Sequence, residues 1–387
     1  MNSNEKYCEK IDKAKAAIKV DISNVHQFKN GSAQFNNAYH LAEANLRHFF
    51  PELDQIKCEQ IIADIFLHQH MAMYDQSDFS LVDETILDDK AHIFNSEKSN
   101  HGRIFCTYHL GSYRQVFHFL AKAGIDCLLL IASKTLREQG ESFIQESKKL
   151  EASCGWTGKL TVIDAEDRNS LLYCLRALKK GVSVVVFIDG NVGVGKNNSR
   201  KDLTNVNFFG KEILARNGIA YLSHLSGASI IPVTSKRVVE NRLKLTTHQS
   251  INPEQTLREE YVTTTTNALY ALLEKEISDR LGQWEGWLYV EKFIKKGAEL
   301  GMKHSDNEII HVDVRSSLST NINRFALLVY SEQFVLLDKA KHSFFMLDES
   351  SVNIFRSGIN GYIDLNTYAL HSTKVQQLIK LGALKSQ

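Results

Sequence analysis

Between Ala38 and Tyr74, apolar residues recur at intervals of three and four positions. Side chains at that spacing lie on one face of a helix, so the pattern predicts helices that bury one side. Pro51 separates the stretch into two helices, because proline fits poorly in a helix interior. Residues 1–100 are therefore predicted to form a mostly helical N-terminal region of the domain that follows.

After Gly102 the pattern changes to short apolar runs that alternate with longer helical ones. This alternation predicts an α/β domain, residues 101–298, with a mostly parallel sheet flanked by helices. Thr256–Leu281 is predicted to be a long helix, and Trp284–Phe293 a strand or turn that closes the domain. The predicted strands are Arg103–Thr107, Cys127–Ala132, Leu160–Asp164, Val182–Asp189, Ser229–Val239 and Arg242–Thr247.

The end of the chain, residues 307–387, shows a third pattern. It follows a polar, glycine-containing stretch, Lys295–Ser305, that is predicted to be a linker. Three strand-like runs followed by two helical segments predict a small α+β domain with the outline of a winged helix. The runs are Phe325–Tyr330, Gln333–Asp338 and His342–Leu347, and the helical segments are Glu349–Arg356 and Lys374–Leu384.

The composition suits a protein with a large buried core and no strong charge of either sign. Of its 387 residues 43% are hydrophobic, and 46 basic residues nearly balance 45 acidic ones, for a net charge of +1. Without a strongly basic field, nucleic acid is not predicted as a partner. Residues 1–25 are charged and lack a long apolar stretch, so we expect a cytoplasmic protein without a transmembrane segment.

The six cysteines are scattered along the chain without a Cys-x2-Cys pair. This spacing favours reduced thiols over disulfides or a zinc site. Cys106 is predicted to be a buried strand residue and not a nucleophile. His68, His70 and Asp75 could be drawn as metal ligands, but no second cluster completes a site, so we predict no bound metal.

The segment Thr107–Arg114 carries the strongest candidate for chemistry, because His109 lies in a turn after a strand-like run. An imidazole titrates at about pH 6.5 and can take a proton from an attacking hydroxyl or amine. Asp189 ends another strand-like run, and the carboxyl ends of strands in an open α/β sheet face the ligand crevice. Asp189 is therefore predicted to line the site or orient the imidazole, with Asp164 or a backbone carbonyl as alternatives.

The glycine-rich stretch Gly190–Asn197 nearly matches a phosphate-binding loop. Such a loop needs Ser or Thr after its lysine and a helix N-terminus beyond it. Here Asn197 follows Lys196, and the next residues begin a helix poorly. We predict an acceptor-side loop instead of a nucleotide site.

Five segments together resemble the lipid A late acyltransferases, the lauroyl and myristoyl transferase branch of the lysophospholipid acyltransferase superfamily. They follow the family's order and span about Ala38 to Lys296. The resemblance implies a glycerolipid acyltransferase-like fold and an acyl thioester donor, carried by coenzyme A or a carrier protein, with no resident cofactor. The segments are Ala44–Leu53, Tyr108–Tyr113, Phe187–Asn191 with Asn207–Gly210, Gly218–Val233 and Gln283–Phe293.

Two features depart from that family. Its members carry Asp or Glu five positions after the catalytic histidine, where this chain has Arg114, and the lipid A enzymes have an N-terminal membrane-spanning helix that this sequence lacks. If Arg114 lies close to His109, its charge would lower the pKa of the imidazole. Its guanidinium is also suited to bind a phosphate or carboxylate of the substrate.

The resemblance also assigns residues to substrate binding. Gly111 and Ser112 lie in a turn whose backbone amides, together with that of Leu110, could stabilise the oxyanion. Arg200 lies on a basic loop that could meet a phosphopantetheine donor or simply be solvated. Aromatic residues could line an acyl pocket or belong to the core: Phe208, Phe209, Trp284, Trp287 and Tyr289.

The C-terminal domain resembles the peptide-binding chaperone of pyrroloquinoline quinone biosynthesis and related recognition elements of peptide-modifying enzymes. The resemblance implies that it binds a precursor or leader peptide as an added strand. A structural appendage or a dimerisation unit is the alternative. The segments that carry it are Phe334–Asp338, His342–Asp348, Ser350–Gly358 and Leu378–Leu384.

Together these features predict a transferase that moves an acyl or aminoacyl group from a thioester to a hydroxyl or amine of a peptide or natural-product precursor. His109 would act as the base. A non-catalytic binding protein that recruits a peptide is one alternative. A lipid acyltransferase in peripheral contact with a membrane is another.

Overall fold

The chain forms two compact units in the computed structural model. One comprises residues 1–19 and 59–295, and the other comprises residues 20–58 and 296–387. The structure describes residues 3–27, 32–94, 101–190, 202–238, 242–253, 257–294, 318–330, 332–359, 363 and 373–386.

The first unit is built on a seven-stranded sheet in the order β1-β9-β8-β2-β5-β3-β4. All neighbouring strands are parallel except β8 and β9. The predicted α/β domain with a mostly parallel sheet is confirmed. The strands are β1 (Ile86–Asp89), β2 (Ile104–Thr107), β3 (Cys127–Ile131), β4 (Leu160–Asp164), β5 (Ser183–Phe187), β8 (Ile230–Arg237) and β9 (Leu243–Thr247).

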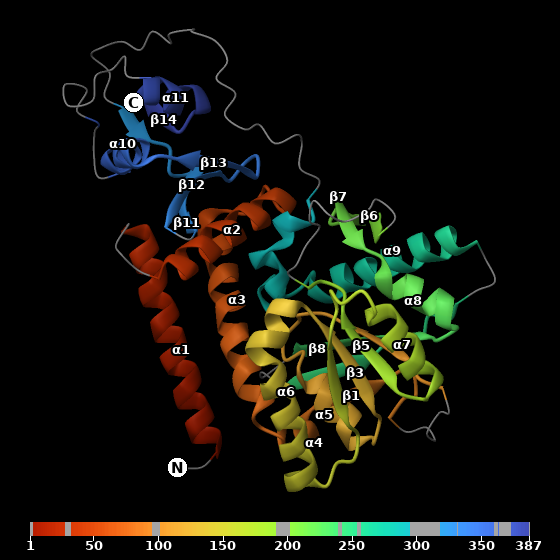
Figure 1. Ribbon diagram of the computed structural model, residues 1–387. Coiled ribbons are helices and arrows are strands. Elements are labelled where there is room, and N and C mark those ends of the chain that lie inside the picture. The colour runs from red at the N-terminus through yellow and green to blue at the C-terminus, as the bar shows by residue number, and fades with distance from the viewer. Residues whose placement is uncertain are drawn as a thin grey trace. The chain divides into compact units, whose positions relative to one another are not determined.

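The helices of this unit pack around the sheet in two groups, which Figure 1 shows around β3, β5 and β8. The short helix α4 (Leu81–Glu84), α5 (Gln115–Lys122) and α6 (Ser133–Cys154) form one group of contacts. The second consists of α7 (Ser170–Lys179), α8 (Gly218–Ser226) and α9 (Arg258–Ile277). Because helices cover the sheet, its central strands are apolar runs instead of alternating patterns; all four residues of β2 are buried.

The N-terminal region is mostly helical, as predicted: α1 (Ser3–His26), α2 (Ala33–Phe49) and α3 (Gln55–Gln76). It also contributes β1, which the sequence pattern did not reveal. The division into units differs from the predicted boundary, because residues 20–58, including α2, belong with the C-terminal strands. Buried polar pairs explain this grouping: Lys339 Nζ donates to Glu43 Oε2 at 2.8 Å, and His342 Nε2 lies 3.0 Å from Asn45 Oδ1.

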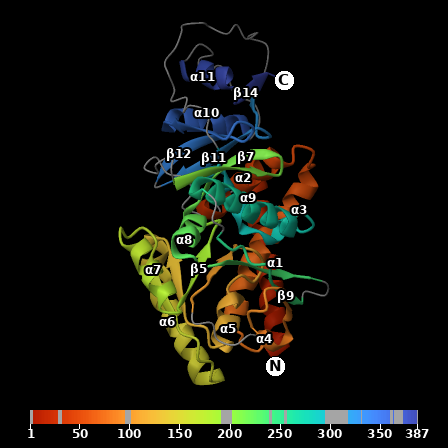
Figure 2. The same ribbon diagram turned by 90° about the vertical axis from the view of Figure 1, so that its right-hand side faces the viewer.

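One segment of the first unit was missing from the sequence prediction, and another resolves an alternative that the sequence left open. A hairpin of β6 (Leu203–Phe208) and β7 (Lys211–Arg216) lies along α9 (Figure 2) and was not predicted. Its two-residue turn, Phe209–Gly210, has positive φ angles of 47° and 71°, as tight hairpins of this kind require. The tryptophan segment, predicted to be a strand or a turn, consists of short 3-10 turns: η3 (Leu281–Gln283), η4 (Glu285–Leu288) and η5 (Val290–Lys292).

The second unit combines α2 with the C-terminal strands and helices. Its three-stranded antiparallel sheet has the order β11-β12-β13, so β11 and β13 are the two edges. The remaining elements are a short β10–β14 pair and two helices that pack over the core. The elements are β10 (Leu318–Thr320), β11 (Phe325–Tyr330), β12 (Gln333–Asp338), β13 (Ser343–Leu347), α10 (Glu349–Ile359), α11 (Thr373–Leu381) and β14 (Leu384–Ser386).

Helix α2 covers the β11 edge of that sheet. Asn37 Nδ2 donates to Val329 O at 2.6 Å, and Val329 N donates back to Asn37 Oδ1 at 3.0 Å. Asn36 Nδ2 donates to Leu327 O at 3.1 Å. The amide side chains thus take the place of a neighbouring strand. The predicted linker, Lys295–Ser305, lies outside the described residues.

Candidate active site

The register of two central strands brings His109 and Asp189 together. Strands β2 and β5 are parallel neighbours, and Thr107 is paired with Phe187 at their carboxyl ends. His109 and Asp189 each follow two positions after that pair, so both leave the sheet at the same point. This is the edge at which open α/β sheets bind ligands.

Asp189 holds His109 through both its ring and its backbone. His109 Nδ1 lies 2.9 Å from Asp189 Oδ1, and His109 N donates to Asp189 Oδ2 at 2.9 Å. Trp284 Nε1 donates to the same Oδ2 at 2.7 Å. The Asp189 side chain is 2% exposed, whereas the His109 side chain is 22% exposed. The carboxylate therefore fixes the ring from inside the protein and leaves the imidazole accessible.

The pKa of His109 is raised above its usual value. Burial alone would lower this pKa, but the charge and hydrogen bond of Asp189 outweigh burial, and Glu285 adds to the rise. Arg114 acts to lower the pKa and is outweighed. Arg114 thus acts in the predicted direction, but the pKa of His109 is raised overall because Asp189 lies beside the imidazole.

Three aromatic side chains surround the imidazole. The ring of Phe187 lies 4.6 Å from that of His109, centroid to centroid, and the ring of Tyr113 lies 4.9 Å away. Tyr289 approaches edge-on, with its ring centroid at 6.3 Å. Aromatic walls lower the polarity around the imidazole, which strengthens electrostatic interactions there.

Glu285 is a second acidic residue beside His109 that the sequence did not single out. Its backbone N donates to His109 O at 3.0 Å, and Leu110 forms an isolated bridge with Trp284. Burial raises the pKa of Glu285, whereas His109 and a hydrogen bond from Gln69 lower it. The sequence analysis singled out the segment Gln283–Phe293 for its tryptophans. It could not show that Glu285 lies beside His109, because the two residues are far apart in the sequence.

The turn after His109 is shaped by Gly111, whose φ is +56°. A Cβ there would lie 2.5 Å from Ser235 O, so only glycine fits without a shift of the backbone. Leu110 N donates to Tyr108 O at 2.7 Å and Gly111 N to Gln283 O at 2.9 Å. Two of the three amides expected to stabilise an oxyanion are thus used within the protein, which corrects that expectation.

Ser112 belongs to a buried polar cluster beneath the turn and does not face the site. Its Oγ donates to Asp75 Oδ2, which also accepts a hydrogen bond from Arg237 Nη2. Tyr7 Oη donates to Asp75 Oδ1 at 2.9 Å, and Ser235 Oγ donates to Ser112 O at 3.0 Å. Ser112 is 1% exposed. Its place in the structure makes it a support of the turn after His109 and not a substrate contact.

Arg114 points away from the imidazole toward α3 and α6. Its Nη1 donates to Gln76 Oε1, and its Nη2 donates to Gln139 Oε1 at 3.2 Å. Its Cζ lies 5.4 Å from the ring centroid of Phe143 and 5.7 Å from that of Tyr113, within the range of cation–π attraction.

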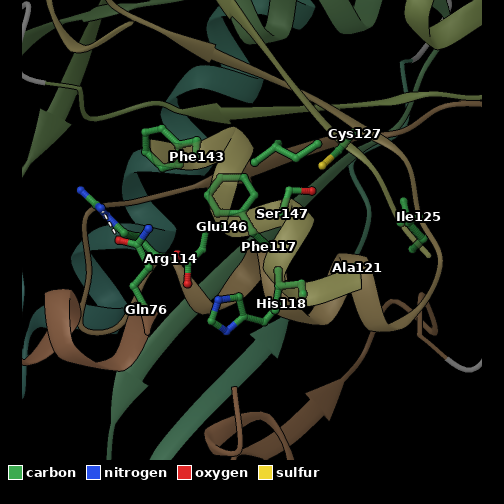
Figure 3. A pocket seen from close by; sticks show the side chains of 13 residues that line it. Gln76, Arg114, Phe117, His118, Ala121, Ile125, Cys127, Phe143, Glu146 and Ser147 are labelled. Atoms are coloured by element: carbon green, nitrogen blue, oxygen red, sulfur yellow. Dashed lines mark hydrogen bonds between the residues drawn. The ribbon is translucent and has the colours of Figure 1, made fainter. Parts of the chain in front are cut away.

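A small cavity lies behind Arg114. Figure 3 shows Arg114 and Gln76 at one end, Phe117 and Phe143 in the middle, and Cys127 and Ile125 at the other end. The volume open to water-sized molecules is about 20 Å³, enough for one or two waters. Most of the lining is apolar and comes from α5, α6, β3 and β4.

The remaining predicted residues do not gather around His109 as a group. Phe208 is fully buried, with its ring 5.3 Å from Trp284 and 6.1 Å from Tyr270, which makes it part of an aromatic core. Phe209 forms the β6–β7 turn, where its N donates to Glu274 Oε2 at 2.6 Å. Arg200 and the glycine-rich loop after Gly190 lie outside the described residues.

Asp164 and Cys106 have structural roles. Asp164 accepts from Ser133 Oγ, at 2.8 Å to its Oδ1 and 2.7 Å to its Oδ2, and is no partner of His109. Cys106 is fully buried, and burial raises its pKa. Across the described part of the chain, the acidic, histidine and cysteine side chains form no group of three suited to a metal ion.

Part of the chain matches a known protein family. Residues 156–290 match the family model for the bacterial lipid A biosynthesis acyltransferase. The matched segment is about a third of the chain; it contains Asp189, Trp284 and Tyr289, and it begins after His109. The match supports acyl transfer as the class of reaction.

One solved structure similar to this chain is the 1-acyl-sn-glycerophosphate (LPA) acyltransferase PlsC from Thermotoga maritima. The similarity covers 61% of this chain and 88% of that one, at 14% identity and a TM-score of 0.33. No curated protein matches the sequence. In the regions that the structure describes, none of the helices combines the length and apolar character needed to cross a bilayer.

Proposed function

We propose that this protein is an acyltransferase in which His109 is the general base and Asp189 orients it. The observation that supports this most is the contact between His109 Nδ1 and Asp189 Oδ1 at the ends of adjacent parallel strands. A carboxylate on Nδ1 favours the tautomer with its proton there, which leaves the Nε2 lone pair to accept a proton. Asp189 would thus replace the acidic residue that Arg114 displaces from the usual position.

The proposed reaction transfers an acyl group between two heteroatoms. His109 Nε2 takes the proton of the acceptor hydroxyl or amine as its oxygen or nitrogen attacks the thioester carbonyl carbon. The carbonyl electrons move to oxygen, giving a tetrahedral intermediate. Its collapse re-forms the carbonyl and breaks the carbon–sulfur bond, and the imidazolium returns the proton to the thiolate. The negative pocket of Asp189 and Glu285 stabilises the imidazolium between the two steps.

The donor is proposed to be an acyl or aminoacyl thioester of a carrier protein or coenzyme A. Arg114 would bind a donor phosphate, for which it must exchange its Gln76 and Gln139 contacts. The mostly apolar cavity behind Arg114 is proposed to receive the acyl chain. At about 20 Å³ it must widen to admit a chain, through movement of side chains such as Phe117 and Phe143.

The acceptor is proposed to be a precursor peptide or natural-product precursor presented by the second unit. The β11 edge of its sheet is covered by Asn36 and Asn37, so within the described part of this unit β13 is the edge that could pair with an added strand. Met346 on β13 is 55% exposed, an apolar side chain that a peptide could cover. This supports a peptide-binding role for the winged-helix-like domain.

Intact-mass analysis tests the proposal. The protein is incubated with acylated carrier protein or acyl-coenzyme A of several chain lengths and with peptide and small-molecule acceptors. We expect an acceptor to gain the mass of the acyl group. No gain with any donor and acceptor would contradict acyl transfer and favour a non-catalytic binding protein.

Hydrogen exchange tests the peptide partner separately. A bound precursor peptide should slow exchange of the Ser343–Leu347 amides. Unchanged exchange in β13 while the peptide binds elsewhere would contradict the proposed docking edge.

A further inference from the structure

Tyr289 carries a buried hydroxyl without a hydrogen-bond partner among the residues that the structure describes. The residue is only 9% exposed. Other buried tyrosine hydroxyls of the same unit are paired: Tyr108 Oη donates to Leu269 O at 2.8 Å, and Tyr261 Oη lies 2.8 Å from Ser223 Oγ. Buried hydroxyls are nearly always paired in folded proteins, so an exception calls for a functional explanation.

This hydroxyl belongs to the wall of the candidate active site. The Tyr289 ring stands at 87° to the ring of His109, with the centroids 6.3 Å apart. Asp189, Glu285 and Tyr113 are the groups whose charges act on it most. The 3-10 turns that carry it are anchored by the bond from Tyr289 N to Gly286 O at 3.0 Å. The side chain is thus fixed beside the imidazole with an unused donor.

The proposed reaction needs such a donor. The thioester oxygen becomes negatively charged in the tetrahedral intermediate, and hydrogen-bond donors placed in advance stabilise that charge. The amides of Leu110 and Gly111 donate to Tyr108 O and Gln283 O and are not free to supply it. Of the three turn amides only that of Ser112 is left, on a residue that is 1% exposed, so a side chain in the wall of the site is the better placed donor.

We propose that the Tyr289 hydroxyl donates a hydrogen bond to the oxyanion of the tetrahedral intermediate. This inference rests on the proposed acyl transfer with His109 as the base. The hydroxyl keeps its proton during the reaction and gives the oxyanion a neutral donor. Burial, followed by the Asp189 and Glu285 charges, raises the pKa of Tyr289 well above its usual value, so the group stays protonated at neutral pH.

The test compares three variants with the wild type in the acyl-transfer assay, using the donor and acceptor that the wild type accepts. Tyr289→Phe removes only the unpaired hydroxyl. Tyr261→Phe is the matched control, because it removes a buried hydroxyl that is paired with Ser223. His109→Ala tests the proposed function itself. Steady-state kinetics and thermal unfolding are measured for each.

We expect Tyr289→Phe to lower kcat by about 10²- to 10³-fold, the usual effect of removing one oxyanion donor, with KM changed less than threefold. Its melting temperature should equal or exceed that of the wild type, because no hydrogen bond is lost. Tyr261→Phe should instead lower the melting temperature and keep kcat within threefold.

A kcat of Tyr289→Phe within threefold of the wild type, alongside an inactive His109→Ala, would overturn the inference and leave the proposed function standing. An effect on KM alone would also overturn it, since a positioning or binding role would produce that. If the wild type transfers no acyl group, the proposed function fails and the inference fails with it.

Discussion

Replacement of Asp189 by asparagine tests how the imidazole of His109 is held. Among the residues that the structure describes, Asp189 Oδ2 accepts from both His109 N and Trp284 Nε1, whereas Oδ1 meets His109 Nδ1. Asparagine offers one oxygen that accepts and one amide that donates. The oxygen is expected at the position that meets two N–H donors, so the amide would face Nδ1. Nδ1 would then have to accept, and the proton would move to Nε2, where it blocks the base.

The expected loss of activity is large, because in the wrong tautomer Nε2 carries a proton and cannot accept one from the acceptor. The corresponding change in a serine protease triad lowers kcat by about 10⁴-fold. We expect kcat/KM of Asp189→Asn to fall by about 10³- to 10⁴-fold, or about 4 to 5.5 kcal/mol of transition-state stabilisation. The free energy of unfolding should fall by about 1–3 kcal/mol, because the buried hydrogen bonds lose their charge.

The pH dependence should change in a defined direction. The base acts when neutral, so wild-type activity should rise with pH through the raised pKa of His109. In Asp189→Asn the burial that lowers this pKa remains, with Arg114 lowering it and Glu285 raising it, while the Asp189 charge is gone. The acid limb should therefore move to lower pH.

Initial rates of acyl transfer measured across pH provide the assay. Asp164→Asn is the matched control, because Asp164 also ends a strand of the sheet but binds Ser133. It should keep wild-type rates and the wild-type acid limb. Asp189→Asn activity within threefold of the wild type, with an unmoved acid limb, would refute the account of how His109 is held.

Three further substitutions test the surroundings of the site. Gly111→Ala should lower the free energy of unfolding by about 1–3 kcal/mol, because alanine is strained at the left-handed φ of this position, and the close approach to Ser235 O adds to the cost. Urea unfolding that gives the wild-type free energy would contradict the turn geometry. Asp75→Asn should cost about 3–5 kcal/mol in the same measurement, because Arg237 stays buried without its anion, and a cost below about 1 kcal/mol would argue against the buried cluster as a support. Arg114→Gln should raise the KM of the donor about tenfold, because the proposed contact with the donor phosphate is lost. It should leave the acid limb of the pH profile nearly in place, since Arg114 has the smallest influence on the pKa of His109 among those named above. Steady-state kinetics with a shifted acid limb and an unchanged KM would contradict this role of Arg114.

The parallel sheet could be predicted because its central strands are buried on both faces. Runs such as Val184–Ile188 are then apolar throughout and contrast with the helices between them. The pairing of His109 with Asp189 follows less directly, since it depends on β5 lying next to β2, which sequence order does not reveal. The sequence placed both residues after strands, and only the register showed that they meet.

Other features escaped prediction because they depend on contacts distant in sequence. The β6–β7 hairpin has a phenylalanine at a positive φ, which turn patterns rarely allow, and its N–H is held by Glu274 of α9. Glu285 reaches the site because the 3-10 turns pack against the loop after β2, and the position of Tyr289, which the sequence named as a possible pocket residue, depends on the same contact. Helix α2 was predicted to belong to the same domain as the parallel sheet, because an amphipathic sequence does not reveal which element its apolar face packs against. In the structure Asn37 of α2 pairs with Val329, almost three hundred positions later in the chain.

The most direct test of the central claim is the rate of acyl transfer by His109→Ala, compared with the wild type and with His224→Ala. His224 lies in the last turn of α8 and serves as a histidine control. The account predicts that His109→Ala loses at least about 10²-fold in rate, the lower range for removal of a general base, while His224→Ala retains the wild-type rate. Equal rates for His109→Ala and the wild type would remove His109 from the mechanism and contradict the account.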